Sequence, residues 1–156
     1  MTTIRPRSTR RTSRRPVHIV ATFPAGIPTA VTAPDKATVC QFVLHSLVLD
    51  RSVCAIAHGG VGVTQKALTL AVPVCVVPHG RDQFEIARRV EMAKCGARLL
   101  PKDLTISRLR DKVFHAMSMK EGAIRVAAGY ASTGGAAHLI EQRLLSSARR
   151  KPSDAA

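Results

Sequence analysis

The 156-residue chain has no tryptophan, one tyrosine and four phenylalanines. Since sequence-tolerant binding of single strands relies on aromatic stacking, this shortage argues against a single-strand nucleic-acid platform. No apolar run approaches the ~18 residues that a membrane-spanning helix requires. The apolar stretch at residues 17–22 is too short for a secretory signal and contains His18. With 46% hydrophobic residues, the composition predicts one globular domain with a real core.

Cysteines are few, and their spacing excludes the usual motifs. None of the four forms a C-x-x-C pair, which argues against a zinc site. Three of them lie in apolar strand-like runs, where cysteine behaves as a small buried hydrophobe. We therefore expect a reduced, cytoplasmic protein without a metal site. Asp50 and Asp82 fall in different segments, and no Ser/His/Asp arrangement is present, so nothing indicates a hydrolase.

Acidic residues are scarce, and the excess of basic ones is uneven. The net charge is +14, and residues 1–16 hold six arginines and no acid, while Arg149, Arg150 and Lys151 follow near the C-terminus. Both ends are polar and without periodicity, so we expect disordered tails over residues 1–16 and 148–156. Incidental adhesion to nucleic acid follows from the charge alone. A basic nucleic-acid-associated protein is therefore one alternative function.

Between residues 17 and 147, short apolar strands alternate with amphipathic helices. The strands are fully apolar, which favours a parallel sheet covered on both faces and hence an α/β, Rossmann-like doubly wound domain. Strands are expected at 17–22, 38–42, 53–57, 74–77 and 97–100. Helices are expected at 45–51, 64–70, 83–94, 121–131 and 135–147, and Gly96 is expected to end the helix at 83–94. A further helix, capped by Thr105 or Ser107, is expected to carry Leu109, Val113 and Ala116 on one face.

The glycine-rich segment at residues 58–64 follows one of these strands and leads into a helix. The free N–H groups of a first helical turn and the positive end of the helix dipole both favour an anion. Glycines let the backbone bend sharply and approach a phosphate without an intervening Cβ. This segment therefore predicts a phosphate-binding turn.

In a doubly wound sheet, ligands bind beyond the carboxyl ends of the strands. The segments expected there are unusually polar: they contain His45, His58, Thr64, His79, Arg81, Asp82 and Gln83. Carboxylate and amide groups such as those of Asp82 and Gln83 can grip vicinal hydroxyls of a sugar. Asp82 is equally suited to cap the following helix, His58 could be a structural histidine, and Arg81 a solvated charge. His115 and His138 lie in helical stretches and look structural.

An ordered series of motifs resembles the C-terminal, nucleotide-sugar-binding half of GT-B glycosyltransferases, of the macrolide and UDP-glycosyltransferase type. The resemblance covers about residues 17–147. Its motifs are His-Gly-Gly-Val-Gly-Val-Thr-Gln-Lys-Ala-Leu from His58, Val72-Pro73, Pro78-His79-Gly80-Arg81-Asp82-Gln83, Ala87-Arg88-Arg89-Val90, Phe42-Val43-Leu44-His45-Ser46 and the Ala-rich residues 127–135.

The resemblance implies inverting transfer of a hexose from a UDP- or TDP-sugar to a hydroxyl acceptor, without an obligatory metal or other cofactor. It assigns Asp82 and Gln83 to the donor sugar, and Val43 and Leu44 to the base. It assigns the donor diphosphate to His58, Gly59, Gly60, Gly62, Val63 and Thr64. Leu44, Ala71 and His79 depart from the family pattern, in which proline, glycine and an aromatic residue are usual.

Two parts of the family's enzymes have no counterpart in this chain. The N-terminal domain, which binds the acceptor and supplies the catalytic base, is absent, so no catalytic residue is assigned. The first strand of the C-terminal half is also absent, and in a 3-2-1-4-5-6 sheet it is the central one. Its neighbours would expose unpaired edges unless the chain rearranges to fill the gap.

We therefore expect a donor-binding domain that is inactive alone, or a nucleotide-sugar-binding module that works with a separate partner. The Arg-rich start suggests a further hypothesis, an out-of-frame or misassigned start on a truncated gene. Upstream DNA with no glycosyltransferase-like reading in any frame would exclude it.

Overall fold

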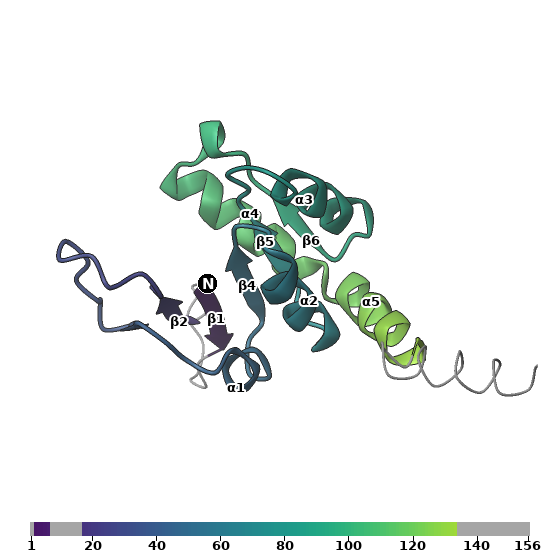
Figure 1. Ribbon diagram of the computed structural model, residues 1–156, viewed down its shortest axis with the longest axis horizontal. Helices are drawn as coiled ribbons and strands as arrows, with labels where there is room; N and C mark the ends of the chain where they lie inside the picture. Colours follow the sequence, from purple (N-terminus) through teal and green to yellow (C-terminus); the bar gives the residue numbers. More distant parts are fainter. Residues whose placement is uncertain (1, 7–16, 134–156) are drawn as a thin grey trace, which may run out of the picture.

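The computed structural model describes residues 2–6 and 17–133, and Figure 1 shows their arrangement. The strands are β1 (Thr2–Pro6), β2 (Val17–Thr22), β3 (Ala37–Cys40), β4 (Cys54–Ala57), β5 (Val74–Val76) and β6 (Gly96–Arg98). The helices are α1 (His45–Leu49), α2 (Val61–Thr69), α3 (Gln83–Met92), the 3₁₀ turn η1 (Pro101–Asp103), α4 (Ile106–Ser118) and α5 (Lys120–Ser132).

The six strands form one sheet in the order β3-β2-β1-β4-β5-β6. Strands β2 and β3 are parallel, as are β4, β5 and β6, whereas β1 is antiparallel to both of its neighbours. Thr2 pairs with Ala21 on one side and Ile56 on the other, so β2 and β4 run in the same direction. The predicted strand order and α/β class are confirmed, but the sheet is mixed rather than wholly parallel.

Strand β1 corrects the expectation of a disordered tail for residues 2–6 and occupies the central place in which a strand was expected to be missing; residues 1 and 7–16 lie outside the described residues. Without it, β2 and β4 would each present a row of unpaired N–H and C=O groups in the middle of the sheet. Thr2–Pro6 fills this gap and pairs with both. Only ten residues separate Pro6 from Val17, which is too few for the crossover of a dozen or more residues that a parallel neighbour requires. The strand therefore enters as an antiparallel one.

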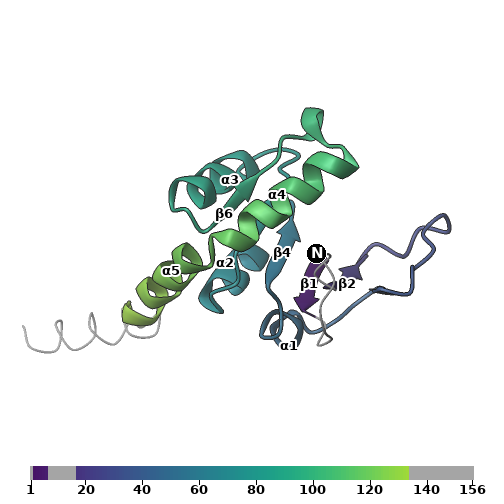
Figure 2. The same ribbon diagram turned by 180° about the vertical axis from the view of Figure 1, so that it is seen from behind.

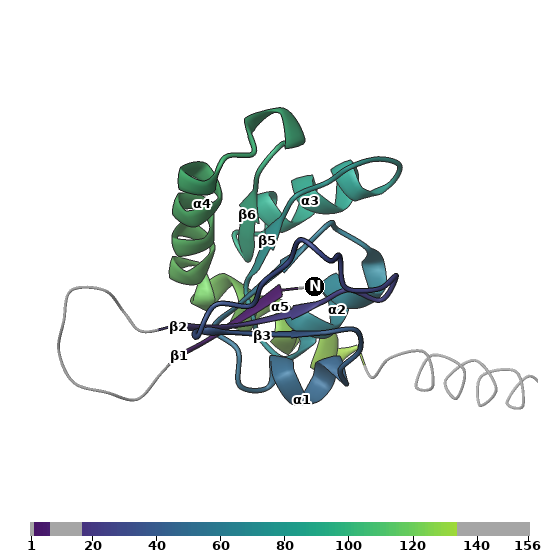
Figure 3. The ribbon, with the colours of Figure 1, turned by 90° about the vertical axis from the view of Figure 1, so that its left-hand side faces the viewer.

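Helices cover the two faces of the β4–β5–β6 half unequally. On one face, a core of twelve buried residues joins the sheet to α1, α2, α3 and α5, with Leu49, Leu68, Val90 and Ala123 as helix members. On the other face, Val113 and Ala116 of α4 pack on Cys54, Cys75 and Ala97. Figure 2 shows α4 running across the sheet from behind, and Figure 3 shows α4 and α3 on opposite sides of β5 and β6.

Most predicted elements are present, with shifted ends. Strand β2 has the predicted bounds, and Thr105 caps α4 by accepting a hydrogen bond from the Arg108 N–H. The prediction for Gly96 is wrong. The positive φ after α3 belongs to Lys94, and Gly96 lies in β6, where a Cβ would collide with the Val74 carbonyl. The helix expected at 135–147 and the tail at 148–156 lie outside the described residues.

Among the described residues, no helix is both long and apolar enough to cross a membrane.

Candidate functional site

The carboxyl ends of β4 and β5 bring two polar loops together. The loop after β4 contains His58 and the glycine turn, and the loop after β5 contains residues 77–82. Gly59 lies where they meet. It is buried with φ +94°, and a Cβ there would lie 2.9 Å from Val76 Cγ1 and 3.1 Å from the Gln83 carbonyl oxygen. Only glycine permits this backbone conformation and this close approach together.

The N-terminus of α2 presents unpaired N–H groups at this edge. The helix begins at Val61 with Gly60 as its N-cap, three residues earlier than predicted, and the first N–H bonded in the helix is that of Thr64, to the Gly60 carbonyl oxygen at 3.1 Å. The N–H groups of Val61, Gly62 and Val63 therefore have no helical partner. Val61 and Gly62 are exposed, and a Cβ at Gly62 would meet no atom within 4 Å. The turn can accept an anion against its backbone.

His58 lies over this turn. A Cβ at Gly60 would come 2.8 Å from His58 Nε2, so the imidazole stacks closely on the Gly60 backbone. The His58 side chain is exposed and forms no hydrogen bond or ion pair among the described residues. Its ring nitrogens are thus available to a ligand at the helix N-terminus.

Gln83 organises the neighbouring loop. Its Oε1 accepts hydrogen bonds from the N–H groups of His79 (2.8 Å) and Gly80 (3.2 Å). The amide oxygen is therefore occupied, and the two N–H donors of the amide remain for a ligand. Arg81 has φ +54°, a conformation uncommon for a residue with a Cβ, and this turn sets the start of α3.

Asp82 occupies the N-cap position of α3 but does not cap it. Its φ and ψ are −65° and −14°, and its side chain forms no capping hydrogen bond. The carboxylate is exposed and, within the described part of the chain, has neither a hydrogen bond nor an ion pair. Of the two predicted roles for Asp82, the structure leaves the ligand role open and gives no capping bond.

Thr64 lies differently from the other predicted residues. It is 4% exposed, and its Oγ1 is buried without a hydrogen-bond partner among the described residues. The residue also lines a cavity of about 260 Å³ between α2, α3 and α5. The Thr64 side chain therefore does not reach the open edge where His58, Gly62 and Asp82 are exposed. Its assignment to a phosphate gains no support from the geometry.

The predicted base-binding residues lie at the same sheet edge, just before α1. Val43 is half-buried and Leu44 is 55% exposed. The next residue, His45, lies near α2: burial and nearby positive charges, including that of Lys66, lower the pKa of His45. The segment thus borders the α2 end of the site, on the side away from α3.

Sequence and structure comparisons agree on one family. The model of the family "Erythromycin biosynthesis protein CIII-like, C-terminal domain" matches residues 13–144. The NDP-glycosyltransferase YjiC of Bacillus licheniformis is 35% identical over 80 residues, which are 51% of this chain and 20% of that protein.

Among solved structures, the glycotransferase of kitacinnamycin superposes with a TM-score of 0.71 at 26% identity, over 80% of this chain and 34% of its own. The glycosyltransferase VinC, solved in complex with dTDP, gives a TM-score of 0.56 at 30% identity, over 62% of this chain and 25% of its own. The chain thus spans about a third or less of each of these proteins. The predicted GT-B resemblance is confirmed.

Proposed function

Because the chain belongs to the family of erythromycin biosynthesis protein CIII-like C-terminal domains, we propose that it binds a UDP- or TDP-hexose at the carboxyl edge of β4 and β5. The observation that carries the proposal is the meeting of the glycine turn with the start of α3 at Gly59. This contact brings the glycine turn next to the Asp82 carboxylate and the Gln83 amide N–H groups, none of which has a partner among the described residues. A sugar diphosphate offers the matching pair of groups, an anion and vicinal hydroxyls.

The diphosphate is assigned to the N–H groups of Val61, Gly62 and Val63 and to the His58 ring. These donors coincide with the positive end of the α2 dipole. The hexose is assigned to the Asp82 carboxylate and the Gln83 amide N–H groups, and the base to Val43 and Leu44. The relative solved with dTDP supports a nucleoside diphosphate as the ligand class.

We further propose that transfer of the hexose to an acceptor hydroxyl needs a second domain or partner that supplies the acceptor site and the base. The matched part of this chain is about a third or less of the length of the relatives that it resembles. Donor binding and transfer are therefore separable: the first is expected of this chain, the second of an assembly.

Calorimetric titration with UDP-glucose and dTDP-glucose tests the proposal. His58→Ala should weaken binding by about 1.5–3 kcal/mol, because a hydrogen bond to a charged diphosphate is lost. His115→Ala removes an exposed histidine from α4, outside this site, and should leave affinity unchanged. The site would be excluded if both variants lost the same binding affinity. It would also be excluded if a cooperatively folded sample gave no heat of binding at millimolar ligand.

Gly62→Ala separates ligand approach from folding. The added methyl meets no protein atom, and alanine is favoured over glycine in a helix by up to about 1 kcal/mol. The variant should therefore be as stable as the parent or more so, yet bind the donor more weakly because the methyl obstructs the phosphate. Unchanged affinity would mean that the diphosphate does not approach Gly62.

A further inference from the structure

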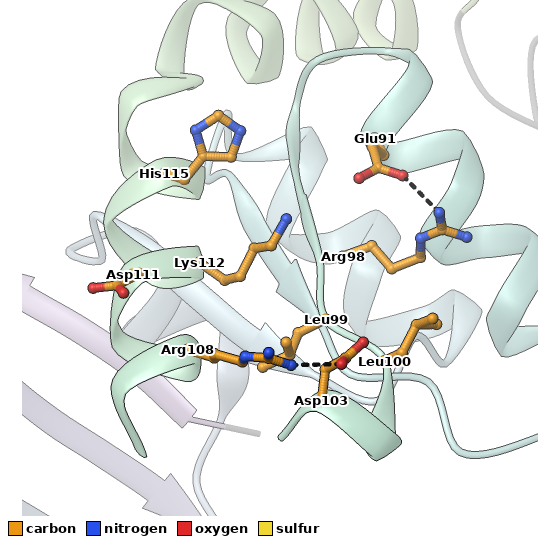
Figure 4. A pocket seen from close by; sticks show the side chains of 9 residues that line it. All are labelled: Glu91, Arg98, Leu99, Leu100, Asp103, Arg108, Asp111, Lys112 and His115. Atoms are coloured by element: carbon orange, nitrogen blue, oxygen red, sulfur yellow. Dashed lines mark hydrogen bonds and ion pairs between the residues drawn. The ribbon is translucent and has the colours of Figure 1, made fainter. Parts of the chain in front are cut away.

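A second pocket lies at the β6 edge of the sheet. Its volume is about 540 Å³, and it is bounded by the end of α3, by β6 and the residues that follow it, by η1 and by α4. This volume is typical of small-molecule pockets. None of the residues assigned above to the nucleotide sugar lines it, so the pocket needs its own explanation. Figure 4 shows its lining side chains.

The pocket contains three cations, of which two are paired. Arg98 Nη2 lies 3.1 Å from Glu91 Oε2, and Arg108 Nη1 is paired with Asp103 Oδ1. Each guanidinium makes a single short contact and keeps further N–H donors. Both pairs line the pocket: in Figure 4 the Glu91–Arg98 pair lies at the upper right and the Arg108–Asp103 pair lies at the bottom.

Lys112 is the third cation and has no such partner. It projects from α4 into the pocket (Figure 4). Asp111 also lines the pocket, but its Oδ1 lies 4.0 Å from Arg110 Nε and it forms no ion pair with Lys112. Lys112 is half-buried and forms neither a hydrogen bond nor an ion pair within the described part of the chain. Its charge is felt by Cys75, but burial raises the pKa of that thiol to about 11, so the thiol stays neutral and does not balance it.

A half-buried ammonium without an ion-pair partner favours an anion, because burial removes part of its hydration. His115 lies one turn further along α4 and is exposed, with its ring unbonded among the described residues. The surface inside the pocket is not only charged: Leu99 is buried and Leu100 half-buried beside it.

We propose that this pocket binds a small phosphomonoester. The phosphate pairs with the Lys112 ammonium and accepts further N–H bonds from Arg98 and Arg108. Together these three cationic groups match its three terminal oxygens. The organic body of the ester lies against Leu99 and Leu100. This site shares no residue with the nucleotide-sugar site, and the two are tested by separate experiments.

A titration of the full chain with phenyl phosphate, followed by ¹H–¹⁵N NMR, tests the proposal. The amides of Leu99, Leu100, Lys112 and His115 should shift together, and inorganic phosphate should bind more weakly at the same amides. Lys112→Gln should raise the Kd for phenyl phosphate about tenfold, as expected for loss of a charged hydrogen bond. Lys112→Arg keeps the charge and should keep most of the affinity.

Lys102→Gln is the matched control, since Lys102 is an exposed lysine of η1 that does not line the pocket. Equal weakening by Lys102→Gln would mean a general charge effect and would overturn the proposal. So would the absence of shifts at the four amides at millimolar phenyl phosphate. Equal affinity for inorganic phosphate would exclude an ester with an organic body.

Discussion

The two halves of the sheet are built differently, and β4 joins them. In the β4–β5–β6 half the strands are parallel, and helices cover both faces through two buried clusters. In the β1–β2–β3 half the central strand is antiparallel, and the link between β2 and β3 over residues 24–34 is exposed and contains no helix. Only one of the hydrophobic residues of β2, Val20, is buried.

The glycine turn depends on both halves, because it follows β4, which pairs with β1 on one side and β5 on the other. The β4–β5–β6 half, called the compact half below, fixes the geometry of the turn through Gly59, Val76 and Gln83. The other half supplies the second neighbour of β4. The site is therefore expected to tolerate changes in the β2–β3 link and to fail when either neighbour of β4 is removed.

The largest effect on stability is expected from adding a methyl group to the tightly packed interior of the compact half. At Gly122, in α5, a Cβ would collide with the Lys94 carbonyl oxygen. Gly122→Ala should lower the free energy of unfolding by about 3 kcal/mol, since backbone must move to relieve the overlap. Gly129→Ala, in the same helix, meets no atom and should be neutral or stabilising by up to about 1 kcal/mol. Urea unfolding measures both, and similar stabilities would contradict the packing of α5 on the end of α3.

A smaller effect is expected from breaking the other half. Thr3 of β1 pairs with Val20 and Ala55. Thr3→Pro removes a ladder N–H from a central strand, where proline is not accommodated, and should cost about 2 kcal/mol. Hydrogen exchange should accelerate in β2 and β4 more than in β6.

Thr32→Pro is the control for this change, because Thr32 is exposed in the β2–β3 link and its N–H forms no hydrogen bond with the backbone of the described residues. It should leave both stability and exchange rates near those of the parent. If Thr3→Pro proved as mild as Thr32→Pro, β1 would not be a central strand.

The smallest effect is a pH dependence that belongs to the compact half. Burial raises the pKa of Cys54 from 9.0 to about 12. A raised pKa in the folded state means that the stabilisation is present below pH 9 and is lost as the pH rises above it, because the unfolded thiol ionises first. The free energy of unfolding should therefore decrease by about 1 kcal/mol between about pH 8.5 and 10.

The melting temperature should fall less steeply with pH across this range in Cys54→Ala than in the parent. In Cys40→Ala it should fall as steeply as in the parent, since Cys40 is only half-buried. An unchanged slope in Cys54→Ala would argue that the thiol is not buried in solution.

The elements that follow local rules could be predicted from the sequence. Strand β2 has the pattern of an apolar run, and Thr105 caps α4 as its residue type favours. Strand β1 could not be predicted, because its five residues adjoin an Arg-rich stretch and its pairing is entirely non-local. The glycines also obscured the start of α2 at Val61, since glycine has low helix propensity.

The site shows the same division. The positions of His58, Gly59, Asp82 and Gln83 after two apolar strands were sufficient to predict that they lie at one sheet edge. The burial of Thr64 depends on packing between helices, and the use of the Gln83 amide oxygen by the His79 N–H depends on the shape of the loop. Neither leaves a signal in residue type or spacing.

A ¹H–¹⁵N NMR titration of the chain with UDP-glucose and with dTDP-glucose tests most directly whether the glycine turn at the start of α2 binds the sugar donor. The amide signals of Val61, Gly62 and Val63 should shift most, accompanied by those of Gly80 to Gln83, while those of Leu99 and Lys112 should not shift. Saturating shifts that avoid the N-terminus of α2, or none at millimolar ligand in a folded sample, would contradict donor binding at this turn.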